Sequence, residues 1–385
     1  MVLLIHLLMI QQLFGTKKCP DTEMDKFKKI IEEKYGKKFD SYWDFHQWSV
    51  ENYTDFWKEM WHYFEVIASV PYEQAFKKTG KGILDCEWFP GAALNYAENI
   101  LRIRDDRVAI ICLDEVGNED SVTFAEMYEE VKTVRCCIPK TWLDGRFKYS
   151  STDGSKNSNC RRFLSKLRRK YYPIDNLASI SESLPNMKTL VIVPTVEETL
   201  SKDLSKIPKR ISRNWKDTLT EKYQILFFEQ LPFNHPISIN FTSGTTGLPK
   251  GSCIQSCSKT FLALLRDFIF HLNLKVMTQS IAIVRDGVSG IIHSPLWHLG
   301  LSSFCLIFDG SQRRLQRLEK YYTKYKITYA FPLSTTYFDG LELMKVWCEP
   351  DVKFNDLKVL TMGASPVKRR NYDFIYKKPK DKDFW

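Results

Sequence analysis

Apolar residues recur at helical spacing in the first part of the chain. Between Met24 and Tyr35 they stand three and four positions apart, which predicts an amphipathic helix. A second helix is expected to follow, with Ser49 as its N-cap and Asn52 as a weak capping-box partner. An aromatic stripe at this spacing is typical of a packing face rather than a ligand site. We assign it to the core, with Tyr53, Phe56, Trp57, Met60, Trp61 and Phe64 as its members.

Short apolar runs rich in β-branched residues follow and predict strands. The run within Asp106–Asp114 is expected to be a buried strand, and a helix is expected to begin after a turn at Val122. Helical patterns also lie at Thr260–Leu272 and Gln312–Lys324. Strands that alternate with helices predict βαβ units, a mostly parallel sheet and the α/β fold class. The other expected strands are Thr189–Pro194, Ile237–Phe241, Phe304–Phe308, Ile327–Phe331 and Leu357–Thr361.

The composition is that of a globular protein. The chain has 385 residues, of which 44% are hydrophobic and 26% charged, with room for one large domain or two smaller ones. These values exclude disordered, collagen-like and disulfide-scaffold proteins. The ten cysteines are irregularly spaced, which favours reduced thiols and a location in the cytosol.

The N-terminus holds a short apolar stretch, Met1–Ile10. It has no basic start and no small-residue cleavage site, so we interpret residues 1–21 as an irregular extension, with a signal peptide as the alternative. The chain contains no run of about 18 apolar residues, so neither a spanning helix nor a membrane partner is expected.

The positive charge is concentrated in one segment. The formal net charge is +10, and Lys140–Lys170 alone holds ten basic residues against two aspartates. Because Ser150–Asn159 is rich in Ser, Asn and Gly, we interpret this segment as a solvated loop. A nucleic-acid-binding patch is the alternative and predicts binding that weakens steeply with salt. The segment lacks interleaved stacking aromatics, so we expect no nucleic-acid partner.

One segment has the residues of a phosphate clamp, directly after the strand expected at Ile237–Phe241. Two glycines allow a tight turn and close approach to a polyphosphate, and the hydroxyl groups and backbone N–H groups can donate to its oxygens. A lysine adds a point positive charge. The candidate residues for the ATP β- and γ-phosphates are Thr242, Ser243, Gly244, Thr245, Thr246, Gly247 and Lys250.

This segment is not a Walker A loop, because Leu248 and Pro249 follow the second glycine. A Ser/Thr/Gly hairpin loop without chemical meaning is the alternative. The order of the ten residues Thr242–Gly251 resembles instead the phosphate-binding signature of the adenylate-forming superfamily, which contains the acyl-CoA synthetases. Three further segments resemble the acetoacetate-activating branch of that family: Ser41–Trp57, Trp88–Leu101 and Phe227–Pro236.

The resemblance runs discontinuously from about residue 22 to residue 376. It implies a two-step ligation in which acetoacetate reacts with Mg²⁺-bound ATP to give an acyl-adenylate, and CoA then displaces AMP. Lys250 and the hydroxyl side chains would hold the departing pyrophosphate. A later turn resembles the family's adenine-binding turn and consists of Gly363, Ala364, Ser365 and Pro366. The residues imply no protein metal ligands.

The resemblance also implies a domain organisation. Residues 22–101 would form the N-terminal helical region of an acyl-CoA synthetase. Residues 102–376 would form an AMP-binding domain, interrupted near 138–170, with a basic tail at 377–385. After Ile138 the chain continues at Pro139 with a segment that the family reaches only later. The interrupted domain would therefore lack part of its parallel sheet.

Two further departures concern activity. Ile281–Leu301 lacks the family's Trp-rich pocket helix and holds only Trp297, with His293 and His298 interpreted as ordinary core or surface residues. The chain stops at Trp385, before the family's ribose-binding aspartate and its small C-terminal domain with the catalytic lysine. We therefore expect an incomplete large domain, no identified catalytic residue and impaired turnover. A non-catalytic ATP-binding remnant is the alternative.

Overall fold

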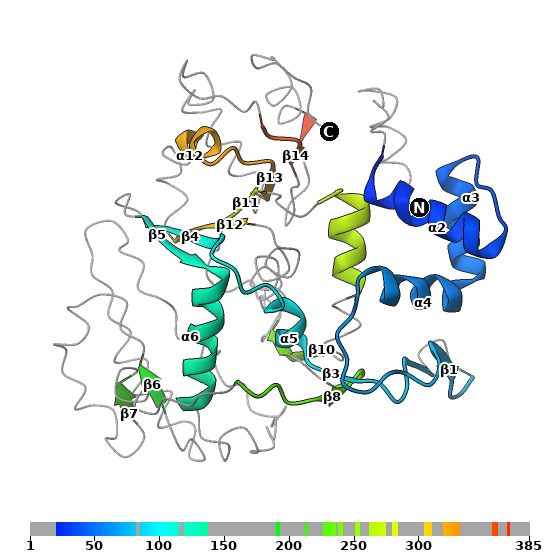
Figure 1. Ribbon diagram of the computed structural model, residues 1–385, viewed down its shortest axis with the longest axis horizontal. Helices are drawn as coiled ribbons and strands as arrows, with labels where there is room; N and C mark the ends of the chain where they lie inside the picture. The colour runs from blue at the N-terminus through cyan, green and yellow to red at the C-terminus, as the bar shows by residue number, and fades with distance from the viewer. Residues whose placement is uncertain are drawn as a thin grey trace.

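The computed structural model of the protein describes fourteen segments of the chain (Figure 1). They are residues 21–81, 85–114, 119–137, 190–192, 212–214, 226–235, 238–241, 251–254, 262–274, 279–283, 304–309, 319–331, 356–360 and 368–369. The basic segment 140–170, the extension before residue 21, the tail 377–385 and the two histidines 293 and 298 lie outside these segments.

Two capped helices open the described chain. Helix α2, Glu23–Tyr35, begins with a capping box between Thr22 and Asp25, and it ends at Gly36 in the left-handed conformation, with φ of 59°. Helix α3, Tyr42–Glu51, begins with a second capping box, between Ser41 and Asp44. A side chain at each N-cap therefore satisfies backbone N–H groups that have no partner within the helix.

The expectation that Ser49 caps a helix is wrong. Ser49 lies inside α3, where its hydroxyl donates to the carbonyl of His46 at 2.7 Å. Helix α4, Tyr53–Tyr63, begins directly after Asn52, which makes no side-chain cap hydrogen bond. The physical reason is that Ser41 stands three residues before an aspartate, which completes the box, whereas Ser49 has no such partner.

The aromatic stripe of α4 is a packing face, as predicted. Its buried members are Phe56, Met60, Trp61 and Phe64, whereas Tyr53 at the start of the helix is 41% exposed. These side chains belong to a core that also contains Phe27 of α2 and Phe45 of α3. The Phe27 and Phe56 rings meet edge to face, with centroids 5.8 Å apart. In Figure 1 the three helices lie together on one side of the central sheet.

A run of short elements connects these helices to the sheet. Strands β1, Phe76–Lys78, and β2, Cys86–Trp88, form an antiparallel pair. Strand β3, Ala93–Leu94, and helix α5, Tyr96–Ile100, follow. Ile100 and Leu101 then pack in a second core with Phe124 and Leu226.

The central sheet has six strands in the order β14-β13-β11-β12-β4-β5, and all pairs are parallel except β4 with β5. A mostly parallel sheet in an α/β fold was predicted, and it is confirmed. The strands are β4 at Val108–Asp114, β5 at Glu119–Thr123, β11 at Gln279–Ile283, β12 at Phe304–Asp309, β13 at Tyr329–Phe331 and β14 at Val359–Leu360.

Strand β4 differs from the expected buried strand. Ala109, Ile111 and Leu113 are buried, whereas Val108 and Cys112 are exposed. The difference arises because side chains alternate between the two faces of a strand. One face of β4 contributes Ala109 to the second core, together with Phe124 and Met127 of helix α6, Phe124–Cys137.

The remaining elements are short. Helix α12, Glu319–Lys324, lies within the helical pattern predicted at Gln312–Lys324. The Glu119 carboxylate at the start of β5 accepts hydrogen bonds from Lys324 and Tyr325 at the end of that helix. Away from the central sheet lie parallel strands β6, Leu190–Ile192, and β7, Ser212–Asn214.

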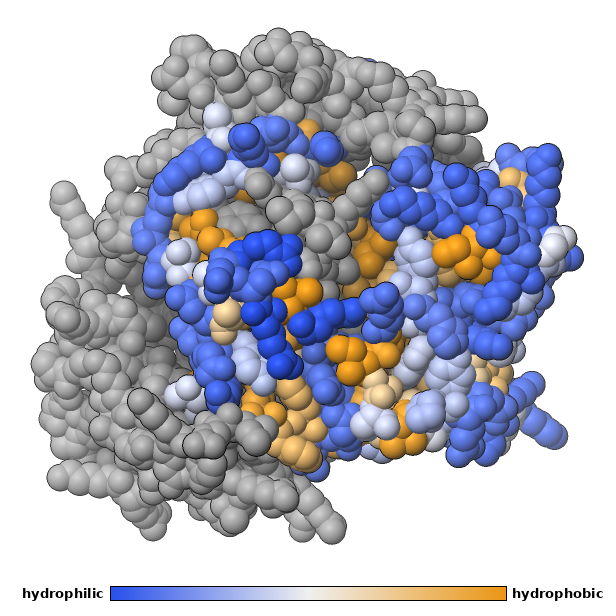
Figure 2. All heavy atoms as spheres, in the orientation of Figure 1, coloured by the Kyte–Doolittle hydropathy of each residue, from blue (hydrophilic) through white to orange (hydrophobic). Residues whose placement is uncertain are grey.

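On the face shown in Figure 2, hydrophilic residues cover most of the described surface, and hydrophobic residues show between them in several smaller areas. Among the described residues, no helix is long and apolar enough to cross a membrane.

Candidate nucleotide-binding site

The predicted phosphate-binding segment connects the two strands of a hairpin. Strand β9, Ser238–Phe241, pairs antiparallel with β10, Gly251–Ile254, and the pair nearest the connection is Phe241 with Gly251. All seven candidate phosphate residues fall in residues 242–250 between these paired ends, and they lie outside the described residues. The structure therefore describes the base of the hairpin but not the side chains expected to touch phosphate.

The predicted adenine-binding residues follow an edge strand of the central sheet in the sequence. Strand β14 ends at Leu360, and the next residues include Gly363, Ala364, Ser365 and Pro366, which lie outside the described segments. Ligands of open α/β sheets bind outside the carboxyl ends of parallel strands. The described strand end is thus consistent with a nucleotide contact, whereas the turn itself stays a prediction.

The chain that leads into the hairpin is fixed to the region around α5. We call residues 226–235 the incoming limb. Strand β8 within it, Leu231–Pro232, pairs antiparallel with β3. The amide of Asn95 donates to the carbonyl of Glu229 at 2.7 Å, and the amide of Gln230 donates to the Glu98 carboxylate at 2.9 Å.

Phe233 anchors the same limb in the aromatic core. Its backbone N–H donates to the carbonyl of Ala92 at 3.3 Å. Its ring lies 4.9 Å from that of Phe89 and 5.9 Å from that of Trp61, measured between centroids. The incoming limb is therefore held by a strand pair, by side-chain amides and by aromatic packing, all a few residues before β9.

The chain that leaves the hairpin enters a helix, within the range predicted at Thr260–Leu272. We call residues 262–274 the outgoing limb. It begins as α-helix at 262–265 and continues as the π-helix η2, Arg266–His271. Phe268, Ile269 and Phe270 are consecutive, and all three are buried. A π-helix has a wider turn than an α-helix and is often found at functional sites.

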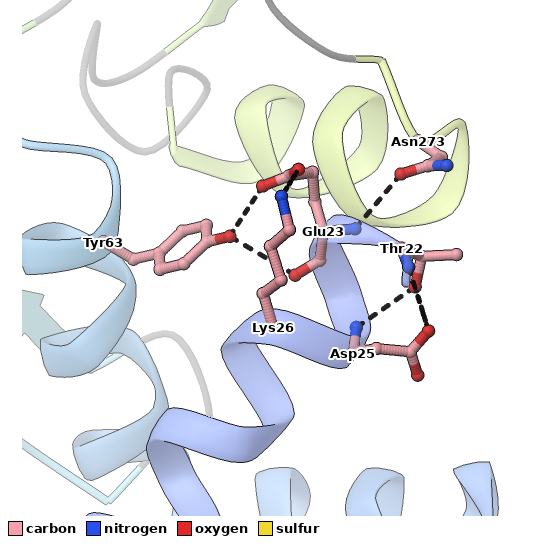
Figure 3. A network of polar contacts seen from close by, with 6 residues as sticks. All are labelled: Thr22, Glu23, Asp25, Lys26, Tyr63 and Asn273. Carbon is pink, nitrogen blue, oxygen red and sulfur yellow. Dashed lines mark hydrogen bonds and ion pairs between the residues drawn. The ribbon is translucent and has the colours of Figure 1, made fainter. Parts of the chain in front are cut away.

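The outgoing limb packs on α2 and α4. The Phe270 ring stacks on Phe27 at 4.9 Å between centroids, and it also contacts Tyr63 and Phe64. Directly after η2, Asn273 adopts the left-handed conformation with φ of 49°. Its side-chain amide oxygen Oδ1 accepts a hydrogen bond from the backbone N–H of Glu23 at 3.1 Å (Figure 3).

Polar groups surround this contact between α2 and the outgoing limb. The Tyr63 hydroxyl donates to the Glu23 carboxylate at 2.8 Å, and Lys26 forms an ion pair with the same carboxylate (Figure 3). Burial raises the pKa of Tyr63, and the hydrogen bond to Glu23 raises it further. Burial also lowers the pKa of His271, which favours the neutral imidazole at the end of η2.

The described residues contain no cluster of three or more His, Cys, Asp or Glu side chains that could hold a metal ion.

Four side chains that hold the two limbs were not predicted from the sequence, namely Asn95, Glu98, Gln230 and Asn273. The signal for Asn95 was its position before a helix, where asparagine is a favoured N-cap. The signal for Asn273 was its position after a helix, where asparagine tolerates the left-handed conformation.

The chain is similar to known synthetases. The family model for the acetyl-coenzyme A synthetase N-terminus matches residues 42–100. The acetoacetyl-CoA synthetase of Macaca fascicularis is 28% identical to the chain, over 93% of the chain and 59% of that protein. The enzyme of the same name from Rattus norvegicus is 29% identical, over 76% of the chain and 49% of that protein.

A solved structure has the same fold. The acetoacetyl-CoA synthetase from Streptomyces lividans superposes with a TM-score of 0.71 at 21% identity, covering 93% of this chain and 60% of that one. The chain thus spans about half to 60% of the length of these relatives. Along most of its length the chain is therefore similar to the acetoacetyl-CoA synthetases, and it shares its fold with one of them.

Proposed function

We propose that the chain activates acetoacetate with ATP, as the adenylating part of an acid–thiol ligase. The observation that carries the proposal is the phosphate-binding signature at 242–250, which connects the paired strand ends Phe241 and Gly251. Loops that join secondary-structure elements of a fixed scaffold are common places for binding residues. The homology to acetoacetyl-CoA synthetases supports acetoacetate as the acid.

The proposed reaction has two displacements. A carboxylate oxygen of acetoacetate attacks the α-phosphorus of ATP, and the bond to pyrophosphate breaks, which gives acetoacetyl-adenylate. The thiolate of CoA then attacks the carbonyl carbon of the adenylate, and AMP leaves with the electrons of the carbon–oxygen bond. The products are acetoacetyl-CoA, AMP and pyrophosphate.

In this proposal the chain contributes positioning and positive charge. Lys250 and the hydroxyl groups of Ser243, Thr245 and Thr246 would neutralise and hold the departing pyrophosphate. The glycines Gly244 and Gly247 would let backbone N–H groups approach its oxygens. Preorganised donors of this kind stabilise the charge that develops on a leaving group. The turn at Gly363–Pro366 would lie against the adenine.

Magnesium would enter as part of the substrate, MgATP. Mg²⁺ keeps several waters and is commonly bound by substrate phosphates together with one or two carboxylates. Further parts of the proposal are the division into a helical region at 22–101 and an AMP-binding domain at 102–376, and a cytosolic location.

The test is acetoacetate-dependent exchange of labelled pyrophosphate into ATP by the purified full chain. This assay reports the first displacement alone, so it does not require CoA transfer. We expect exchange that requires acetoacetate and that falls about 10²-fold or more in Lys250→Ala, because a positioned phosphate donor is lost. Lys38→Ala is the matched control, since Lys38 is 87% exposed and is far in sequence from the hairpin.

Two results would overturn the proposal. Exchange that is equal in Lys250→Ala and Lys38→Ala would remove the phosphate loop from the reaction. No exchange by a folded wild-type chain would remove the ligase activity. In that second case, equilibrium dialysis with ATP distinguishes a non-catalytic ATP-binding protein from a chain that does not bind ATP.

A further inference from the structure

Helix α3 has apolar side chains on two opposite faces. Phe45 and Trp48 on one face are buried in the aromatic core. On the other face, Trp43 and Val50 are 53% and 55% exposed, and the exposed His46 stands between them in the sequence. The spacing of three and four residues places these side chains in one stripe along the helix. A helix that is apolar on both faces is typically covered on both.

The exposed rings of α3 contact one another. The centroids of Tyr42 and Trp43 are 5.2 Å apart, and the His46 ring lies 5.8 Å from Trp43 and 6.0 Å from Tyr42. In Figure 1 α3 lies on the outer side of the three helices, away from the central sheet. These rings and Val50 form an apolar surface that is open to solvent. We call it the outer α3 face, and it consists of Tyr42, Trp43, His46 and Val50.

Carboxylates border the outer α3 face. Asp44 and Glu51 are two helical turns apart on the same flank of the helix, and Asp40 stands just before it; all three are exposed. Between residues 39 and 57 the chain holds no Lys or Arg, although its formal net charge is +10. Among the described residues, the one ion pair of these carboxylates joins Asp40 to Lys38 at 3.9 Å, and both side chains are exposed. The outer α3 face is therefore bordered by negative charge that few cations offset.

We propose that the outer α3 face is the docking site for a basic amphipathic helix of a partner protein. The apolar side of such a helix fits the stripe, because apolar side chains at positions i, i+3 and i+7 are the anchors by which helices pack. Its arginines reach the exposed rings and the flanking carboxylates, since a guanidinium is attracted to the face of a tryptophan or tyrosine ring and pairs with carboxylates. The charge of α3 therefore determines which sign of partner it favours.

The same charges disfavour two other occupants. In a two-fold contact between copies of the chain through this face, the carboxylates of one α3 would approach those of the other, and like charges repel. An anionic membrane surface attracts Lys and Arg, and α3 contains neither. A partner with positive charge is the occupant that complements both the rings and the carboxylates.

A synthetic helix tests the proposal with the full chain. The probe is a fluorescein-labelled peptide of about 18 residues, or roughly five helical turns, with leucine at helical spacing and arginine along both flanks. Fluorescence anisotropy measures its binding. A peptide with glutamate in place of every arginine keeps the apolar stripe and is the control for charge. We expect saturable binding of the arginine peptide that weakens as the salt concentration rises, and no binding of the glutamate peptide.

An aromatic variant and its control assign the binding to α3. Trp43→Ala should raise Kd for the arginine peptide about tenfold, as expected for an anchoring tryptophan. Phe227→Ala removes an exposed ring elsewhere in the chain and should leave Kd unchanged. Because both side chains are exposed, both variants should keep the wild-type urea midpoint.

A charge variant tests the carboxylates. The double variant Asp40→Asn with Glu51→Gln should raise Kd about fivefold and reduce the salt dependence, since two exposed ion pairs with the peptide are lost. The double variant Glu129→Gln with Glu130→Gln on α6 has the same change in charge at exposed positions and should bind as the wild type does. Equal Kd values for the two double variants would overturn the proposed role of charge.

Photo-crosslinking locates the bound peptide directly. Trypsin releases the whole outer α3 face in one fragment, Phe39–Lys58, because no Lys or Arg stands before its last residue. A benzoylphenylalanine in place of one leucine of the probe should label this fragment, which mass spectrometry identifies. Labels mainly on other fragments, a Kd for Trp43→Ala within twofold of that for Phe227→Ala, or no saturable binding would each overturn the inference. So would Trp43-dependent dimerisation, or binding to phosphatidylserine vesicles, by a chain that does not bind the arginine peptide.

Discussion

At the residue scale, Asn99 illustrates how a buried polar side chain holds the fold. It is fully buried. Its amide oxygen accepts a hydrogen bond from the N–H of Ile67, and its amide nitrogen donates to the carbonyl of the same residue, both at 2.9 Å. A third hydrogen bond runs to the carbonyl of Asn95, also at 2.9 Å. Asn99 thus joins α5 to the segment that follows α4, where Ile67 belongs to no helix or strand.

We expect Asn99→Ala to lower the free energy of unfolding by about 2–4 kcal/mol, because the fully buried Asn99 amide and its hydrogen bonds to both backbone groups of Ile67 are lost. Urea unfolding followed by circular dichroism measures this. Asn52→Ala is the comparison, since Asn52 is half-buried and donates to one carbonyl; its cost should be about 1 kcal/mol or less. Equal costs would show that Ile67 finds other partners.

Two tyrosines make stability depend on alkaline pH. Burial raises the pKa of Tyr35 and Tyr63, and hydrogen bonds to Glu59 and Glu23 raise them further. An unfolded tyrosine titrates near pH 10. Because the folded pKa is the higher one, the contribution of each phenol is fully present below about pH 10 and is lost as the pH rises above it.

The expected result is a urea midpoint that is flat between pH 8 and 9 and falls above about pH 10. Tyr63→Phe should have a shallower fall, because it removes one of the protons that the folded state retains. Tyr72 and Tyr325, whose pKa values are also raised, should account for part of the remaining slope. An identical alkaline slope in wild type and Tyr63→Phe would contradict this assignment.

At the element scale, η2 and α2 are joined by one aromatic ring. Phe270 is 5% exposed and contacts Phe27, Tyr63 and Phe64. We expect Phe270→Ala to reduce the free energy of unfolding by about 3–5 kcal/mol, the usual cost of deleting a buried phenyl ring.

The same substitution at Phe227 is the control, since that side chain is 66% exposed. Phe227→Ala should change stability by no more than about 0.5 kcal/mol. Differential scanning calorimetry of both variants gives the comparison. A small effect of Phe270→Ala would mean that the π-helix rearranges to fill the space.

Elements with a local signal were predictable from the sequence, and others were not. The apolar pattern of 24–35 gave α2 because its period matches a helix, and β-branched runs gave β4, β9 and β12. Ser49 was chosen as a cap from its residue type, although the complete box was at Ser41. Strands β5 and β10 were missed because their stability comes from pairing with a neighbouring strand and not from their own residues.

At the scale of the whole molecule, the fold class was predictable and the strand order was not. Alternating strands and helices indicate a parallel sheet, but the neighbours of β4 come from widely separated parts of the chain. The candidate loop at residues 242–250 stays a prediction from its residue types. The contacts that hold residues 226–235 were not predictable, because Asn95 and Glu229 are 134 residues apart and the sequence around one residue does not mark the other.

The contact between Asn273 and Glu23 joins residues that are 250 positions apart. A ribosome adds roughly 5–20 residues per second, so the outgoing limb emerges roughly 12–50 s after α2. During that interval the aromatic faces of α2 and α4 have no Phe270 to cover them. The nascent chain therefore exposes an aromatic surface during that interval, and we expect chaperones at the ribosome exit to bind it.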